Sequence, residues 1–209
     1  DQKHLEYFVE YYRIMKNFCK QRRLYGSNYC YLNGISLLVM CLVVQQKYTD
    51  FKSKYDFMGK FMNYYAEYDF NKPISISNDT VKKFEKKFPS DKIAVIIAPT
   101  MPYRNCLRRI TPISMNMIKK EINIAAGIIK IFPNEMAAKE LFAYRKIEKP
   151  YVELTLQDNN IKNLLKRQKE VSATIWKVFL KMDYYDPDNK WLLKETPYGE
   201  HYAIYKVGI

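Results

Sequence analysis

The sequence is poor in the residues that build metal and redox sites. It has four cysteines, none of them in a C-x-x-C pair, and two histidines, His4 and His201. Structural zinc sites combine four cysteine or histidine ligands at short spacings, so we expect no metal site. Three of the cysteines lie among apolar residues, a pattern typical of buried thiols in a reducing compartment.

Long apolar runs and the standard phosphate loops are also absent. The longest apolar run, residues 35–44, is too short to cross a bilayer, and no signal peptide is recognisable. We therefore expect an intracellular protein with no membrane partner. Neither G-x-x-x-x-G-K-[ST] nor G-x-G-x-x-G occurs, which excludes both common phosphate-binding loops. The chain begins at Asp1, inside a stretch that we expect to be helical. We therefore expect it to be a fragment or a processed product.

Positive charge is what the sequence has in excess. Its 35 Lys and Arg residues outnumber its 22 Asp and Glu residues, for a formal net charge of +13. Such an excess favours a polyanionic partner, and nucleic acid is favoured over an acidic membrane surface. The 48% of hydrophobic residues predict a globular chain, and 209 residues suffice for one large domain or two small ones.

Hydrophobic periodicity predicts an α+β fold in two parts. In residues 1–147 we expect helices over residues 5–19, 35–44, 51–65 and 118–129, and an extended stretch over residues 93–97. Thr49 or Asp50 is expected to cap the third of these helices, and Ser114 the fourth. Residues 148–209 predict a strand, a long helix (160–182) and two strands. This β-α-β-β order is part of a small ferredoxin-like (RRM-like) α/β-sandwich domain.

Residues 16–36 bring together groups that suit a nucleotide. In order they contain Lys16, the basic residues Lys20, Arg22 and Arg23, Tyr25, and turns at Gly26-Ser27-Asn28 and Asn33-Gly34. A lysine can meet phosphates, an aromatic ring can stack on a base, and a glycine admits close approach of the backbone. The alternative is a basic interhelical loop whose glycine and asparagine residues serve turn geometry alone.

The same stretch resembles the start of the central domain of eukaryotic poly(A) polymerases. There the segment K-x-W-A-K-R-x-x-I-Y-S-N-x-x-G-x-L-G-G-V-S joins two helices, and it aligns with residues 16–36 without a gap. Two departures from it matter. Phe18 replaces the tryptophan, and Asn33 replaces the first glycine of the pair. The family's asparagine falls on Ser27, one residue before Asn28.

Two further blocks extend the resemblance over nearly the whole chain. The family's I-I-T-P-A-Y-P-x-x-N-S-T matches residues 96–107, with Pro99, Pro102 and Asn105 in register. Residues 203–209 resemble the strand T-M-W-V-I-G-L that closes the family's RNA-binding domain. The resemblance implies a central helical domain over residues 1–147 and a ferredoxin-like RNA-binding domain over residues 148–209.

The resemblance also implies which residues bind substrate. Lys16 would contact the triphosphate of ATP and Tyr25 the nucleotide. The remaining ATP contacts would come from Ser27 or Asn28, to base or sugar, and from Gly34 and Ile35, against the adenine. RNA would meet basic residues of the loop and of the long helix: Lys20, Arg22, Arg23, Lys166 and Arg167. For Arg22 and Arg23 a solvated loop is an equal alternative.

Catalytic carboxylates are not found among these residues. The family holds its two Mg²⁺ or Mn²⁺ ions with a G-S…D-x-D strand pair of an N-terminal domain. Gly26-Ser27 is not followed by a D-x-D in a strand context, and Asp186-Pro187-Asp188 lies in an expected loop. We therefore expect no catalytic residue in residues 1–209, and we expect the metal ligands to lie outside them. This chain alone should have no polymerase activity.

The resemblance thus implies the non-catalytic, C-terminal portion of a poly(A) polymerase, a polynucleotide adenylyltransferase. Such an enzyme adds AMP from ATP to an RNA 3′ end without a template, in mRNA polyadenylation in the nucleus, with 3′-end processing factors as further partners. Two alternatives stay open: another nucleotidyltransferase, such as a uridylyltransferase, and a non-catalytic RNA-binding scaffold. The basic composition predicts salt-sensitive RNA binding with weak sequence selectivity.

Overall fold

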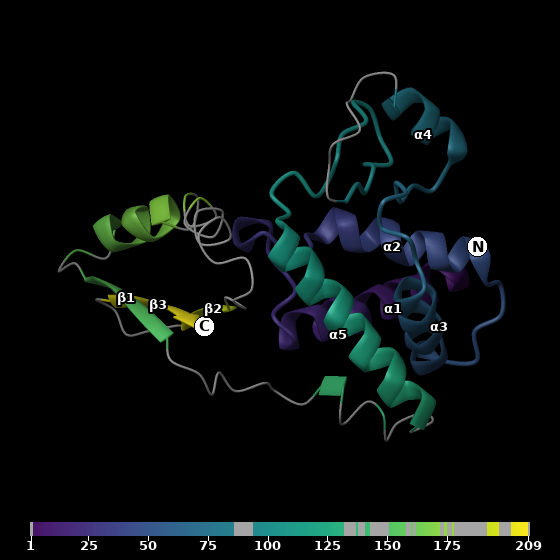
Figure 1. The fold of residues 1–209 in the computed structure, drawn as a ribbon, viewed down its shortest axis with the longest axis horizontal. Helices are drawn as coiled ribbons and strands as arrows, with labels where there is room; N and C mark the ends of the chain where they lie inside the picture. The colour runs from purple at the N-terminus through teal and green to yellow at the C-terminus, as the bar shows by residue number, and fades with distance from the viewer. Residues whose placement is uncertain are drawn as a thin grey trace. The chain divides into compact units, whose positions relative to one another are not determined.

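The chain forms two compact units, which are described separately. The computed structural model describes residues 2–85, 94–131, 137, 141–142, 151–157, 160, 162–171, 174, 177, 192–196 and 202–208. The first unit comprises residues 1–27 and 31–144, and the second comprises residues 28–30 and 145–209. Figure 1 shows helices in the first unit, and a small sheet with a helical segment in the second.

The described part of the first unit is built from helices α1 (Gln2–Gln21), α2 (Gly34–Lys47), α3 (Lys54–Ala66), α4 (Asn78–Glu85) and α5 (Pro112–Ile131). Helix α3 packs against α1 and α5, and α1 also packs against α2. The apolar run over residues 35–44 lies in α2, where five side chains have no exposed surface: Leu37, Val39, Met40, Cys41 and Val44. The predicted helical character of this part is confirmed.

Aromatic rings fill the space between α1, α2 and α3. Tyr11 stacks on Phe57 with ring centroids 4.6 Å apart, and the row of rings continues along α3 through Phe61 to Tyr65. Tyr65 is buried, and its hydroxyl donates a hydrogen bond of 3.0 Å to the Met40 carbonyl of α2. Because each ring buries a large apolar area and the Tyr65 hydroxyl keeps a partner, this cluster holds three helices together.

Residues 94–108 form an extended loop on the way to α5. Ile96 and Ile97 are buried, and they form single β-bridges with Ile74 and Asn105 respectively. The predicted extended stretch is therefore confirmed at these two residues, which pair singly rather than in a sheet. At the end of the loop, α5 begins at Pro112, two residues before its predicted cap.

The second unit contains a three-stranded antiparallel sheet in the order β1-β3-β2. Its strands are β1 (Tyr151–Gln157), β2 (Leu192–Thr196) and β3 (Tyr202–Gly208). Leu154 of β1 pairs with Tyr205 of β3, and Lys194 of β2 pairs with Lys206 of β3. The prediction that residues 151–156 and 202–207 share one sheet is confirmed, whereas the ferredoxin-like fold of the unit stays a prediction.

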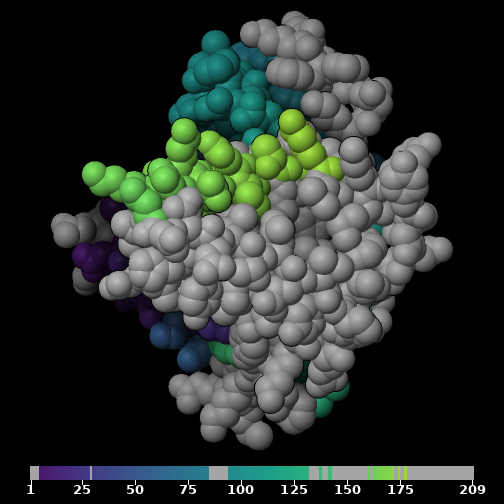
Figure 2. Space-filling model, turned by 90° about the vertical axis from the view of Figure 1, so that its left-hand side faces the viewer, coloured from purple at the N-terminus to yellow at the C-terminus, as the bar shows by residue number. Residues whose placement is uncertain are grey.

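Residues 162–171 of the second unit are helical, within the predicted helix over residues 160–182. Figure 2 shows this segment, in green, at the surface of the face that it draws. The end of the predicted helix and the string Asp186-Pro187-Asp188 lie outside the described residues. None of the described helices is long and apolar enough to cross a membrane.

Candidate functional site

The loop between α1 and α2 folds back on itself. The Leu24 N–H donates to the Cys19 carbonyl at 2.7 Å as α1 ends, and Tyr25 forms a single parallel bridge with Leu32. Gly26 has φ 129°, a conformation that a side chain disfavours, and its N–H donates to the Leu32 carbonyl at 2.7 Å. The turn therefore returns the chain so that Tyr25 lies beside the residues that start α2.

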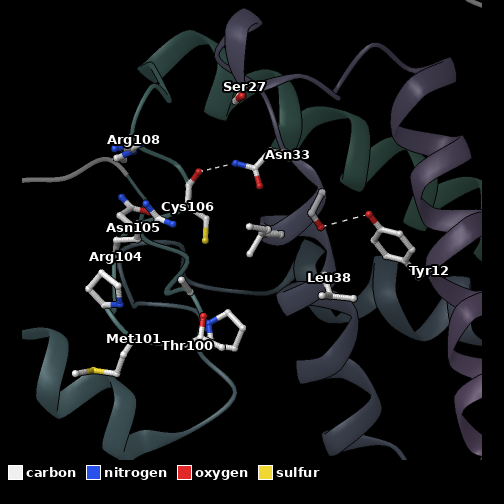
Figure 3. Close-up of a pocket in the computed structure, with 15 residues that line it drawn as sticks. Tyr12, Ser27, Asn33, Leu38, Thr100, Met101, Arg104, Asn105, Cys106 and Arg108 are labelled. Carbon is white, nitrogen blue, oxygen red and sulfur yellow. Dashed lines mark hydrogen bonds between the residues drawn. The ribbon is translucent and has the colours of Figure 1, made fainter.

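Asn33 connects two of the three segments that carry the resemblance. Its Oδ1 accepts the Ser36 N–H at 2.9 Å while Ser36 Oγ accepts the Asn33 N–H at 2.8 Å, a capping box that starts α2. Its Nδ2 donates to the Cys106 carbonyl at 2.8 Å (Figure 3). A glycine could make none of the side-chain contacts, so the departure from the motif at Asn33 joins α2 directly to the 94–108 loop.

Asn105 fixes the conformation of that loop. The side chain is buried, and its Oδ1 accepts the N–H groups of Ile96 and Leu107 at 3.1 and 2.9 Å. Its Nδ2 donates to the Ala94 carbonyl at 3.1 Å. A buried amide with three hydrogen bonds to backbone groups holds the chain on both sides of it, which defines where the neighbouring residues point.

A cavity of about 700 Å³ opens between the start of α2 and the 94–108 loop (Figure 3). This volume is in the range of small-molecule sites. The wall consists of Tyr12, Ser27, residues 33–35, Leu38, residues 98–102, residues 104–106 and Arg108. These lining residues include two arginines and no carboxylate, so the cavity favours an anion. Within the described part of the chain, His, Cys, Asp and Glu form no cluster that could hold a metal ion.

Lys16 lies beside the cavity rather than in its wall. Its Nζ is 5.7 Å from the ring centroid of Tyr12 and 5.5 Å from that of Tyr25. The Tyr12 hydroxyl donates to the Gly34 carbonyl at 3.4 Å, and a Cβ at Gly34 would lie 3.2 Å from the Tyr25 hydroxyl. One ammonium, two phenol rings and a glycine that leaves room for them therefore form one cluster at the start of α2.

Tyr12 is a neutral hydrogen-bond donor in this cluster. Burial, with the neighbouring Tyr25 hydroxyl as a second cause, raises the pKa of Tyr12 to about 12. Its proton therefore stays on the phenol at physiological pH, and the ring offers Lys16 an aromatic face rather than a negative charge. The lysine charge thus remains available to an anionic ligand.

The predicted ATP-binding residues are divided between the cavity and its margin. Three line the cavity: Ser27, Gly34 and Ile35. Two lie beside it in the cluster around Gly34: Lys16 and Tyr25. Asn28 lies in a 3₁₀ turn, Ser27–Tyr29, and does not line the cavity, so only Ser27 of the two alternatives reaches the wall.

Arg22 is a structural residue of the core. Its side chain is 8% exposed, and its Nη1 lies 3.4 Å from the carboxylate of Glu121 on α5, which is 2% exposed. Its Nε donates to the Leu141 carbonyl at 3.0 Å. The alternative of a solvated loop is corrected for Arg22, because its side chain is largely withdrawn from solvent in this ion pair. Its contact with RNA stays a prediction.

The other basic residues predicted to contact RNA are less buried. Lys20 is exposed at the end of α1, with its Nζ 6.0 Å from the ring centroid of Tyr25. Arg23 is half-buried and has φ 58°, so that its backbone is in the left-handed region. Lys166 and Arg167 are exposed on the helical segment of the second unit. Their contacts with RNA stay predictions.

Three cavity residues were not singled out by sequence patterns: Tyr12, Arg104 and Arg108. Tyr12 belongs to an apolar helix face, where a tyrosine is indistinguishable from any other core residue. The two arginines carried a weak signal, because Arg104 lies within the block that matches residues 96–107 and Arg108 follows it directly. What the sequence does not show is that this loop and the start of α2 face one cavity.

Comparison with known proteins identifies the family. Residues 7–144 match the family model described as the poly(A) polymerase central domain. A poly(A) polymerase from Entamoeba histolytica is 29% identical over 125 residues, which make up 59% of this chain and 23% of that protein. The matched part thus corresponds to less than a quarter of the relative's length. The family match extends over more than half of the 209 residues and includes every residue that lines the cavity. The chain belongs to the poly(A) polymerase central domain family.

Proposed function

We propose that the cavity at the start of α2 binds ATP and the 3′ end of RNA for a poly(A) polymerase. In this proposal the chain is the substrate-binding, non-catalytic portion of an enzyme that adds AMP to RNA without a template in mRNA polyadenylation. The observation that carries it is the cavity itself. Its walls come from two family segments, joined by a hydrogen bond between Asn33 and Cys106, which are 73 positions apart in the sequence.

Each part of ATP would find a suitable group. The adenine would lie against Gly34 and Ile35, because the glycine admits close approach and the half-exposed isoleucine side chain offers an apolar surface. The Ser27 hydroxyl in the cavity wall would contact the base or the sugar. The triphosphate would meet Lys16, whose ammonium lies beside the cavity against aromatic rings.

The reaction would also require Mg²⁺ or Mn²⁺, which aligns the RNA 3′-hydroxyl with the α-phosphate of ATP. Because the sequence offers no G-S…D-x-D pair, we propose that the carboxylates for these ions lie outside these residues. In that arrangement the residues of this chain bind and orient the two substrates.

A nuclear location and contacts with 3′-end processing factors follow from the same proposal. Both rest on the family alone. Imaging a fluorescent fusion of the parent protein would test the location, and accumulation outside the nucleus would contradict it.

The test of ATP binding is Lys16→Ala in the complete enzyme, which includes the metal-binding carboxylates. We expect mainly the KM for ATP to rise, because the contact to phosphate forms already in the ground state. A lost hydrogen bond between charged groups costs about 1.5–3 kcal/mol, which corresponds to roughly 10- to 150-fold in KM. Tyr25→Phe should cost less than Tyr25→Ala if the ring rather than the hydroxyl contacts the nucleotide.

Lys130→Ala is the matched control, because Lys130 is an exposed lysine near the end of α5 and does not line the cavity. It should leave the KM for ATP unchanged. A Lys16→Ala enzyme with normal ATP kinetics and a lower melting temperature would show that Lys16 only packs on the tyrosines, and the proposed ATP contact would be wrong.

A further inference from the structure

Two arginines give the cavity a second positively charged edge. Arg104 and Arg108 both line the cavity and are both exposed to solvent. Neither lies at a position that the resemblance assigns to ATP or RNA. A guanidinium presents a planar fork of N–H donors that fits a phosphate with two parallel hydrogen bonds, so a pair of them on one loop is suited to an anion.

The backbone around these arginines is held in place. The Arg104 carbonyl accepts the Ala98 N–H at 2.9 Å, and the buried Asn105 side chain fixes the next residue. The Cys106 N–H donates to the Ile96 carbonyl at 2.7 Å. Because the loop is held between the two arginines, the backbone positions from which their side chains start are set before a ligand arrives.

The charges of both guanidinium groups influence the same thiol, that of Cys106. Burial raises the pKa of the Cys106 thiol, while the charges of Arg104 and Arg108 both lower it. Cys106 and the two arginines all line the cavity, so both positive charges lie along the same wall. A single phosphate-bearing strand passing this edge could therefore meet both.

This edge is distinct from the one that Lys16 provides. Figure 3 shows Arg104 and Arg108 on one side of the cavity and Tyr12 on the opposite side. Lys16 lies on the Tyr12 side, since its Nζ is 5.7 Å from the Tyr12 ring. A ligand in the cavity would thus have one cationic group at the α1 side and two at the loop side.

We propose that Arg104 and Arg108 form a subsite for the phosphodiester groups of the RNA strand whose 3′ end enters the cavity. The inference rests on the proposed function, which assigns the ATP triphosphate to the opposite edge at Lys16. A polymer needs an edge that is open to solvent, and both arginines are exposed. Each phosphate that they neutralise would release counterions, which makes the subsite measurable through salt dependence.

The test compares RNA and ATP binding by the 209-residue chain and its variants. Fluorescence anisotropy with 5′-fluorescein-labelled decaadenylate gives the RNA affinity at several salt concentrations, and mant-ATP gives the nucleotide affinity. The Arg104→Gln/Arg108→Gln variant should bind the RNA at least about tenfold more weakly at low salt. Its slope of log K against log[salt] should be shallower by about 1.4, since each phosphate contact on a single strand contributes roughly 0.7. Its affinity for mant-ATP should stay within about twofold.

Two further variants separate contact from charge. Lys52→Gln/Lys130→Gln removes two exposed positive charges that do not line the cavity, and it should keep the wild-type salt slope. Arg104→Lys/Arg108→Lys keeps the charge and loses the fork, so it should keep the slope and bind RNA several-fold more weakly. Circular dichroism of every variant checks that the fold is intact.

Several results would overturn the inference. An equal loss in the Lys52→Gln/Lys130→Gln variant would mean that only net charge matters. A loss of mant-ATP affinity as large as that of RNA would place the triphosphate at this edge. If the wild-type chain binds both probes and the arginine variant keeps the RNA slope, the inference alone fails. If the wild-type chain binds neither probe, the proposed function fails as well.

Discussion

At the scale of single residues, the Arg22–Glu121 pair has the largest expected effect on stability. Both side chains are buried, and removing one of them would take this ion pair away from a charge that stays in the core. We expect Arg22→Gln to lower the free energy of unfolding by about 3–5 kcal/mol. Arg22→Met combined with Glu121→Leu should recover much of that loss, because a buried pair of charges also carries a large desolvation cost.

Urea unfolding of the purified chain measures this effect. Lys60→Gln serves as the control, since Lys60 pairs with Asp56 one turn away at a partly exposed site on α3. Such pairs contribute about 0.3–0.5 kcal/mol. A loss for Arg22→Gln as small as that for Lys60→Gln would show that the buried pair does not stabilise the core.

Arg22 also shows why residue roles were only partly predictable. It belongs to a run of basic residues, and no local pattern indicates which of them turns inward. Its partner Glu121 is 99 positions away, so the deciding contact is invisible in the neighbouring sequence. Gly34 and Ile35, by contrast, line the cavity, because their motif fixes both the turn and the start of the following helix. Their contact with the adenine stays a prediction.

At the scale of elements, Asn33 has two separable tasks. Its Oδ1 caps α2, and its Nδ2 holds the Cys106 carbonyl of the 94–108 loop. Asn33→Asp keeps the acceptor for the cap and loses the donor, so it should cost about 0.5–1.5 kcal/mol of unfolding free energy. Asn33→Ala loses both and should cost about 0.5–2 kcal/mol more, the usual value of a cap.

Urea midpoints of the two variants, with mant-ATP binding as a second readout, test this division. The Asp variant should bind mant-ATP more weakly than wild type even where it is fully folded, because the loop that forms one cavity wall is released. Wild-type stability and wild-type binding in the Asp variant would mean that the hydrogen bond to Cys106 contributes nothing.

Helices were the most predictable elements, and their ends the least. The continuous apolar run of α2 and the apolar spacing of α5 identified both helices. The third helix, however, is capped by Ser53, whose Oγ accepts the Asp56 N–H, rather than by Thr49 or Asp50. Thr49, Asp50 and Ser53 are all of residue types that cap helices, and the local sequence does not decide among them. That the start of α2 and the 94–108 loop line one cavity could not be predicted, since it depends on two segments meeting in space.

At the scale of the whole molecule, buried thiol and phenol groups make the free energy of unfolding depend on pH in the alkaline range. Burial raises the pKa of Cys19 to about 12 and lifts the pKa values of Cys41 and Tyr65 well above their ordinary ranges. Above about pH 9 the unfolded chain releases the Cys19 proton while the folded chain keeps it. The contribution of Cys19 to the free energy of unfolding is therefore fully present below about pH 9 and falls as the pH rises toward 12.

The expected slope for Cys19 is about 1.4 kcal/mol per pH unit over that range. Cys19→Ala should flatten the decline of unfolding free energy between about pH 9 and pH 11 by this amount. Val44→Ala, a truncation at another fully buried position, should lower stability equally at every pH. Urea titrations at a series of pH values measure both, and parallel curves for Cys19→Ala and wild type would contradict the prediction.

The division into two units has an optical consequence. Both tryptophans of the chain, Trp176 and Trp191, fall in the second unit, whereas the stacked Tyr11 belongs to the first. Emission excited selectively through tryptophan therefore reports on the second unit, and the near-ultraviolet dichroism of tyrosine is weighted toward the first. If both signals are lost at the same urea concentration, the units unfold in one cooperative transition, and if they separate, each unit folds by itself. The chain thus carries two intrinsic spectroscopic reporters of its own folding cooperativity.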